Sequence, residues 1–166
     1  MQVTFKGQAI DVQGKPLQVG DRIPEVELKN GQGELVNLTN LLAGKVTILS
    51  VVPNILTRTC ELQTKRFDEE SQNQAFQFYT VSRNSVDEFN QWNRDNGLEV
   101  ATLSDTSHDF GDKFGIQITL GDAELLTRAV YIVDSDLTIK YVDYVAEVSE
   151  EPDYDKALQG AKDLQA

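Results

Sequence analysis

The most constraining feature of the sequence is an unbroken run of mostly apolar, β-branched residues at 46–52. A strand without polar alternation is usually covered on both faces, as in the centre of a parallel sheet. The run ends at Pro53, which cannot donate to a β-ladder. Residues 57–73 follow, rich in helix formers and free of glycine and proline. A buried strand, a proline-led loop and a long helix therefore predict the centre of an α/β fold.

The remaining elements alternate around this centre. Lys6 and Gly7 divide the first dozen residues into two alternating segments, which predict a β-hairpin. Hydrophobic patterning predicts further strands at 26–28, 35–38, 76–81, 100–103, 129–133 and 139–145, and helices at 39–44, 86–95, 108–114 and 153–164. This order predicts an α/β sandwich with a central mixed sheet flanked by helices, and a thioredoxin-like fold has the same order. With 166 residues, no repeat and no linker, we expect residues 1–166 to form a single domain.

Charge and cysteine content narrow the classes of function. The chain has 15 basic and 27 acidic residues, a formal net charge of −12, which disfavours binding to nucleic acid or to an anionic membrane surface. It has no apolar run of about 18 residues and its start lacks the apolar segment of an export signal. One cysteine and one histidine can form neither an internal disulfide nor a two-histidine metal site. We expect a cytoplasmic protein without metal or cofactor.

The lone cysteine, Cys60, is expected in the first turn of the helix that follows the buried strand. The free amides and the dipole at a helix start stabilise a thiolate, and Arg58 adds a nearby positive charge. Glu61 opposes it, but its carboxylate can turn into solvent. Thr57, three residues earlier, is either a hydroxyl partner of the sulfur or the N-cap of the helix. The alternative is that Cys60 is a small buried hydrophobic residue.

Five segments together resemble one known family. The sequence from Val51 to Cys60 is similar to the active-site loop of peroxiredoxins. That loop contains, in chain order but not adjacent, a proline, a threonine or serine, and a cysteine, here Pro53, Thr57 and Cys60. Other matches resemble the bacterial atypical thiol peroxidases within that family: residues 3–7, residues 125–130, Asp134 and residues 151–154. The resemblance covers nearly the whole chain. It implies a thioredoxin-like fold, a homodimer, and reduction of hydrogen peroxide or alkyl hydroperoxides by a thiol.

The resemblance also implies roles for four residues. Cys60 is the expected peroxidatic nucleophile, and Thr57 would hydrogen-bond its sulfur and the peroxide oxygens. Arg128 would hold the thiolate and the leaving oxygen, and Pro53 would shield the sulfur from water. A fixed guanidinium suits a reaction in which charge builds on a leaving oxygen. We expect Arg128 in a strand, and the alternative for it is a surface ion pair.

The chain departs from this family at two positions. The family's resolving cysteine is missing, and alignment places Asn93 there, to within about one residue. A sulfenic acid at Cys60 must then react with an external thiol: a small molecule, a thioredoxin-like protein, or Cys60 of another subunit. Leu56 replaces a common aspartate, which either makes the pocket wall more apolar, favouring organic hydroperoxides, or marks a degenerate relative.

Three further expectations follow. A non-catalytic binding or redox-sensing module remains the alternative to a peroxidase, because the resolving cysteine and the loop aspartate are absent. A thioredoxin-type disulfide oxidoreductase is disfavoured, because Gln63 stands where a Cys-x-x-Cys pair needs its second thiol. Four residues are candidates for an apolar dimer face: Phe5, Ile10, Phe89 and Trp92.

Overall fold

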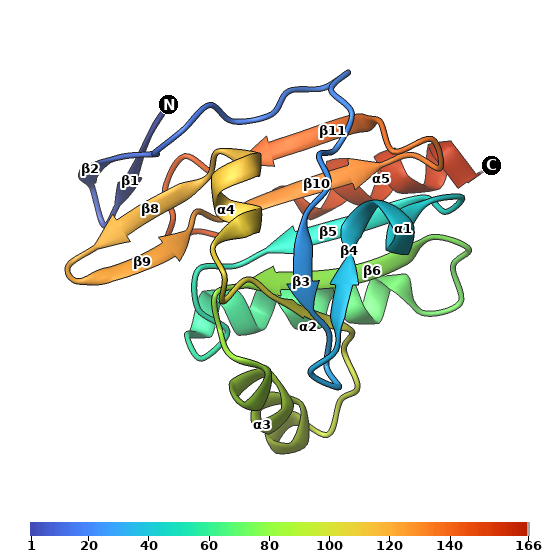
Figure 1. Ribbon diagram of the computed structural model, residues 1–166, viewed down its shortest axis with the longest axis horizontal. Coiled ribbons are helices and arrows are strands. Elements are labelled where there is room, and N and C mark those ends of the chain that lie inside the picture. Colours follow the sequence, from blue (N-terminus) through green and yellow to red (C-terminus); the bar gives the residue numbers. More distant parts are fainter. Residues whose placement is uncertain (166) are drawn as a thin grey trace.

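A seven-stranded mixed sheet forms the centre of the computed structural model, which describes residues 1–165 (Figure 1). One of its inner strands, β5 (Thr47–Val51), is buried at all five positions, as the mostly apolar run predicts. It runs parallel to β6 (Gln77–Ser82), and β6 runs parallel to β7 (Thr102–Ser104). The parallel centre places the ends of β5 and β6 side by side, and the loops that leave these ends build the site described below.

Antiparallel strands complete the sheet on both sides. β10 (Ala129–Val133) pairs with β5, and β11 (Ile139–Tyr144) pairs with β10. At the opposite edge β3 (Glu27–Lys29) meets β7 and carries β4 (Leu35–Asn37). The strand order is therefore β11-β10-β5-β6-β7-β3-β4. The late strand pair 129–145 joins the same sheet, as expected.

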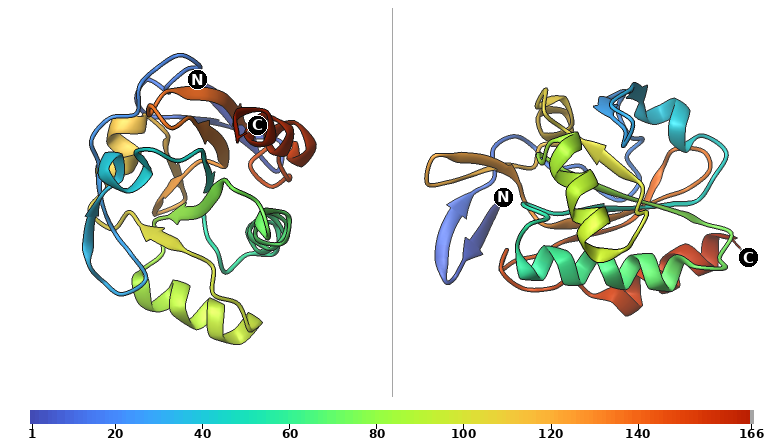
Figure 2. Two further views of the ribbon diagram at one scale, coloured as in Figure 1. Left: turned by 90° about the vertical axis from the view of Figure 1, so that its right-hand side faces the viewer. Right: turned by 90° about the horizontal axis from the view of Figure 1, so that it is seen from below.

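Helices cover both faces of the sheet (Figure 2). The helices α2 (Arg58–Ser71) and α5 (Tyr154–Gln165) pack on one face through a cluster that includes Ile48, Phe67 and Leu158. On the other face, α1 (Leu38–Leu42) and α4 (Asp109–Phe114) contribute to the larger core. The helix α3 (Val86–Asn96) lies beside β7, near the start of α2.

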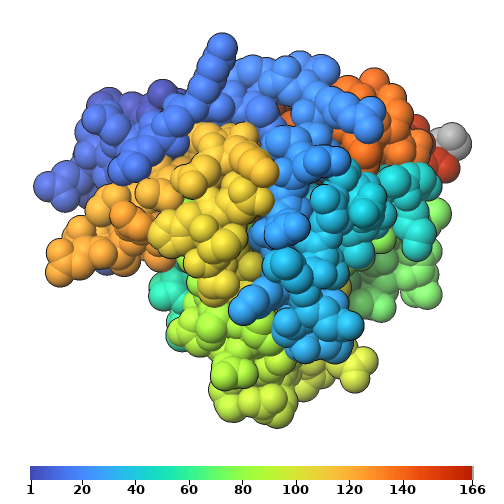
Figure 3. Space-filling model, viewed as in Figure 1, coloured from blue at the N-terminus to red at the C-terminus, as the bar shows by residue number. Residues whose placement is uncertain are grey.

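Two hairpins lie outside the sheet at one end of the molecule (Figures 1 and 3). One is the expected N-terminal hairpin, β1 (Gln2–Phe5) with β2 (Gln8–Asp11). The other, β8 (Gln117–Leu120) with β9 (Ala123–Leu126), is not among the expected elements. Val3, Val12, Ile118 and Val148 form a buried cluster between them. The expectation that Arg128 lies in a strand is wrong, because β9 ends at Leu126 and β10 begins at Ala129.

The architecture is a thioredoxin-like α/β sandwich with an added N-terminal hairpin. Within residues 1–165, no helix is long and apolar enough to cross a bilayer.

Candidate active site

Cys60 is the third residue of α2, directly after the loop that leaves the buried strand β5. Its backbone amide is one of the first four of the helix, which have no partner within the helix and carry the positive end of the dipole. The residue is fully buried and packs with apolar side chains of the loop, α3 and the segment before β7: Val52, Ile55, Phe89, Trp92 and Val100. Burial alone fits a structural cysteine, so the polar neighbours of the sulfur decide its role.

The polar neighbour of the sulfur is Arg128, whose side chain arrives from the segment between β9 and β10. Its Nη2 atom donates to Sγ of Cys60 at 3.3 Å. Nη1 donates to Oε1 of Gln63 at 2.9 Å, and Nε donates to the carbonyl of Val148 at 2.8 Å. The residue is only 2% exposed, and among the described residues no carboxylate pairs with it. Arg128 is therefore no surface ion pair, and its charge is directed at the sulfur.

Gln63 fixes the direction of this guanidinium, a role that sequence reasoning missed. Its Nε2 atom donates to Oγ of Ser50 on β5 at 2.8 Å, which leaves Oε1 to accept from Arg128. Gln63 stands one turn after Cys60, so both side chains leave the same face of α2. That spacing is the signal that could have identified it.

Thr57 and Pro53 frame the loop before the helix. Thr57 occupies the N-cap position of α2, but its side chain caps no amide. Its hydroxyl donates to the carbonyl of Asn54 at 2.8 Å rather than to the sulfur of Cys60. Pro53 is buried, and both residues line the cleft described below.

Asn84, at the end of β6, holds this loop in place. Its Oδ1 atom accepts the amide of Ile55 at 2.8 Å, and its Nδ2 donates to Oδ1 of Asn54 at 3.1 Å. Asn54 in turn accepts the amides of Leu56 and Thr57. One buried side chain thus holds two residues of the loop directly, and through Asn54 it supports two more. The contact joins residues 29 positions apart, which no local pattern reveals.

The carboxylate of Glu61 does not oppose a thiolate. It pairs with Nη1 of Arg58 at 3.3 Å and with Nζ of Lys65 at 3.2 Å on the outer face of α2. The sequence predicts that this carboxylate turns into solvent, and in the structure it forms ion pairs with two cations on α2.

A cleft of about 280 Å³ lies over the site, between the loop, α2 and the two hairpins. Pro53, Thr57 and Arg128 are among its lining residues, whereas the fully buried Cys60 does not line it. The surface of the cleft is largely apolar, from Phe5, Leu120, Leu125 and Val148. Leu56 does not line it, and its side chain is 58% exposed. The expectation that Leu56 makes the wall apolar is therefore wrong, because the hairpins supply the apolar surface.

A carboxylate fastens the N-terminal hairpin to this cleft. Glu147 accepts hydrogen bonds from the amides of Lys6, Gly7 and Ser149 and from the hydroxyls of Thr4 and Ser149. These hydrogen bonds hold the pKa of Glu147 well below its ordinary value of 4.5, the Ser149 hydroxyl being the largest cause. The same segment supplies the Val148 carbonyl that holds Arg128. Sequence reasoning missed Glu147.

The helix α3 is fixed at both ends. A capping box of Ser85 and Glu88 begins it, and Gly97 in the left-handed conformation ends it. Asn93, at the place expected for a second thiol, donates to the carbonyl of Val100 at 3.1 Å and accepts its amide at 3.0 Å.

Two candidates for the dimer face are inside the protein. Phe89 is fully buried and Trp92 is 5% exposed, both packed with Cys60. Their assignment to a dimer face is wrong, because this side of α3 covers the start of α2. Phe5 and Ile10 are half-buried beside the cluster between the hairpins.

Two other kinds of candidate site, a larger groove and a metal cluster, receive no support from the described residues. A groove of about 680 Å³ between the β3–β4 turn and α3 is lined largely by amides and aliphatic side chains, and neither Thr57 nor Arg128 lines it. Within the described part of the chain, no three histidine, cysteine or acidic residues are grouped to hold a metal ion.

Comparisons with known proteins agree with this geometry. The model of the AhpC/TSA family matches residues 19–142. A thiol peroxidase of Bacillus subtilis is 36% identical over 166 residues, 98% of each chain. A thiol peroxidase of Streptococcus pneumoniae is 38% identical over 165 residues, 98% of this chain and 99% of the relative. Among solved structures, a peroxiredoxin-like protein from Aquifex aeolicus superposes with a TM-score of 0.89 at 27% identity, covering 98% of this chain and 96% of that one.

Proposed function

Because this chain belongs to the AhpC/TSA family, we propose that it is a thiol-dependent peroxidase in which Cys60 is the nucleophile. The observation that carries the proposal is the contact at 3.3 Å between Nη2 of Arg128 and Sγ of Cys60, in a buried site beside an open cleft. A guanidinium fixed by two further acceptors has little left to bind except an anion at the sulfur or an oxygen bound next to it.

The chemistry follows from these positions. The Cys60 thiolate attacks one oxygen of a hydroperoxide in line with the O–O bond, so that an S–O bond forms as the O–O bond breaks. The hydroxyl proton of the attacked oxygen passes to the leaving oxygen, which departs as an alcohol, or as water when the substrate is hydrogen peroxide. The sulfenate left on Cys60 takes up a proton from solvent and becomes the sulfenic acid. Arg128 stabilises the charge that builds on that oxygen, which is where a fixed donor accelerates a reaction most.

Thr57 and Pro53 complete the site in this proposal. The hydroxyl proton of Thr57 is engaged by the Asn54 carbonyl, so its lone pairs remain free to accept a hydrogen bond from the peroxide O–H. Pro53, buried at the inner side of the cleft, limits the access of water to the sulfur.

Recycling requires an external thiol, because the chain has one cysteine. The first external thiol attacks the sulfenic acid and releases water, leaving a mixed disulfide on Cys60. A second thiol resolves this bond, so that one hydroperoxide and two thiols give an alcohol, water and a disulfide. The reductant is a small thiol or a thioredoxin-like protein. The apolar wall of Phe5, Leu120 and Leu125 favours alkyl hydroperoxides beside hydrogen peroxide.

The setting of the enzyme is part of the proposal. We infer a single domain over residues 1–166, a homodimer, as the family resemblance implies, and a cytoplasmic location, where a lone thiol stays reduced. The charge of −12 disfavours nucleic acid and anionic membranes as partners. Light scattering after gel filtration tests the dimer, and a monomeric mass at micromolar concentration would contradict it.

Stopped-flow mixing with hydrogen peroxide tests the function. We expect rapid loss of one thiol per chain, far faster than for free cysteine, and no reaction in Cys60→Ser. A steady-state assay with dithiothreitol, thioredoxin or glutathione then separates an enzyme from a redox-sensing module. Sustained peroxide consumption with any one of them supports the enzyme. A single turnover with all three would favour the sensing module, and a thiol no faster than free cysteine refutes the proposal.

A further inference from the structure

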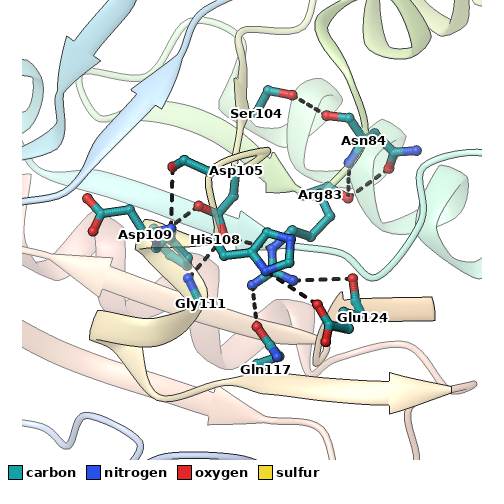
Figure 4. Close-up of polar contacts among 12 residues, drawn as sticks. Arg83, Asn84, Ser104, Asp105, His108, Asp109, Gly111, Gln117 and Glu124 are labelled. Carbon is teal, nitrogen blue, oxygen red and sulfur yellow. Dashed lines mark hydrogen bonds and ion pairs between the residues drawn. The ribbon is translucent and has the colours of Figure 1, made fainter. Parts of the chain in front are cut away.

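A buried ion pair that the proposed reaction does not use lies at the end of β6. Nε of Arg83 donates to Oδ2 of Asp105 at 2.9 Å, and the two side chains are 6% and 0% exposed (Figure 4). The carboxylate also accepts the amides of Phe110 and Gly111, which fixes it to the start of α4. A buried pair is weak evidence for stability, because desolvation offsets its attraction. The direction of the remaining Arg83 donors is therefore more informative.

Those donors hold the β8–β9 hairpin. Nη2 of Arg83 donates to Oε1 of Gln117 on β8 at 2.8 Å, and Nη1 donates to the carbonyl of Glu124 on β9 at 3.2 Å (Figure 4). An arginine spreads its donors over three nitrogen atoms in a rigid plane, whereas a lysine has only one compact ammonium nitrogen at the end of its stem. One side chain thus joins the end of the central sheet to both strands of a hairpin that pairs with no strand of that sheet.

The position of this hairpin determines the wall of the active-site cleft. Leu120 and Leu125, at its tip and on its second strand, line the cleft. Its end at Leu126 leads within two residues to Arg128. A shift of the hairpin therefore moves the apolar wall relative to Cys60.

The side chain of Arg83 packs tightly against the backbone of α4 at Gly111. A Cβ atom at Gly111 would collide with Nη2 of Arg83 and would press on the side chain of Leu126. The guanidinium lies directly on the helix backbone, so its position is defined by contact as well as by hydrogen bonds.

We propose that Arg83, anchored by Asp105, is a positioning residue that sets the enzyme's preference for organic hydroperoxides. It holds Leu120 and Leu125 where they contact the organic group of a substrate bound at Cys60. This inference rests on the proposed peroxidase function. The next residue, Asn84, holds the opposite side of the site through Ile55 and Asn54, and so provides a matched comparison.

The test compares two substrates in three variants. Arg83→Lys keeps the charge beside Asp105 and loses the fork to the hairpin. Gln117→Met leaves the ion pair intact and removes one of its links to the hairpin. Asn84→Ala loosens the cysteine loop and leaves the hairpin alone. Rate constants for loss of the Cys60 thiol are measured with hydrogen peroxide and with cumene hydroperoxide, after circular dichroism has confirmed folding.

We expect Arg83→Lys to slow the reaction with cumene hydroperoxide by about tenfold, the range for lost apolar contacts in a pocket, and to change that with hydrogen peroxide by about twofold at most. Gln117→Met should lower the ratio of the cumene hydroperoxide rate constant to the hydrogen peroxide rate constant by about threefold. This variant tests the inference if Arg83→Lys does not fold. Asn84→Ala should slow both substrates equally. If this ratio stays at the wild-type value or rises in folded Arg83→Lys and Gln117→Met proteins, the inference about Arg83 is wrong, while the proposed peroxidase function stands. A wild-type thiol that reacts with neither substrate refutes the proposed function, and the inference with it.

Discussion

Replacing Arg128 by methionine tests whether its guanidinium drives the reaction at Cys60. Methionine retains an unbranched apolar stem in a site that is 2% exposed, and deletes the charge and all three hydrogen bonds. The deletion has two separable consequences, because one of the three acceptors is the reacting sulfur and the other two belong to Gln63 and Val148.

The structure allows both consequences to be estimated. Loss of one fixed donor directed at a developing oxyanion lowers rates by about 10²–10³, or about 2.7–4 kcal/mol in the barrier. The Val148 carbonyl and Oε1 of Gln63 each lose a partner, at about 1–3 kcal/mol of stability apiece. Because domains unfold with about 5–15 kcal/mol, the variant should fold, with a lower melting temperature. Its rate constant should fall far more than partial unfolding can explain.

The assay is the stopped-flow loss of the Cys60 thiol under excess hydrogen peroxide, well below the variant's melting temperature. Arg58→Met is the control. It changes the formal net charge from −12 to −13, as Arg128→Met does, and it lies two residues from Cys60 in the sequence. Arg58 lines the cleft, but its side chain is 74% exposed and its ion pair is with Glu61, so we expect a change of about twofold at most. A folded Arg128→Met protein that reacts within about threefold of wild type would refute the electrostatic role of Arg128.

Two further substitutions test the surroundings of the site. Glu147→Gln should lower the melting temperature at neutral pH and make the melting temperature less dependent on pH in acid. The reason is that the pKa of Glu147 is depressed in the folded state. The carboxylate therefore stabilises the protein above the unfolded value of about 4.5, and this stabilisation is lost as the pH falls below that value. The loss is progressive between 4.5 and the much lower pKa of the folded state, so thermal unfolding at pH values of about 7 and 3 checks this, and equal losses on acidification in both proteins would contradict it. Asn93→Cys should allow the oxidised Cys60 to condense with the new thiol, detected as the loss of two hydrogens by mass spectrometry, and should cost about 1–2 kcal/mol through the two hydrogen bonds to Val100. Overoxidation of Cys60 without any internal disulfide would contradict the prediction and show that a thiol at position 93 does not reach the sulfur.

The sequence predicts the centre of the fold well because that information is local. A mostly apolar run without polar alternation specifies a strand covered on both faces, and β5 is buried throughout, Thr47 and Ser50 included. The proline after it and the helix formers beyond specify where the strand ends and α2 begins. Cys60 is placed at a helix start by the same local signals.

The β8–β9 hairpin has a local signal only in its first strand and its turn. Gly121-Asp122 is a two-residue turn of the kind that closes hairpins, but the second strand, Ala123–Leu126, consists of good helix formers, which conceal it. By contrast, no local signal specifies where a long side chain is directed. The contact of Arg128 with Cys60 joins positions 68 apart, and that of Asn84 with Ile55 joins positions 29 apart. Such contacts depend on tertiary packing, and only the family resemblance anticipates the first.

The helix α3 connects the missing thiol to the packing of the site. If a resolving cysteine on this helix reaches Cys60 by local unwinding, each unwound turn breaks backbone hydrogen bonds and exposes apolar surface. Here the capping box at Ser85, the left-handed Gly97 and the side chain of Asn93 all oppose unwinding. Phe89 and Trp92 add a buried face against Cys60 itself. An enzyme recycled by an external thiol needs no motion of α3, so this helix can serve as a fixed wall behind the sulfur, and the reductant must then approach from the opposite side, where the cleft lies.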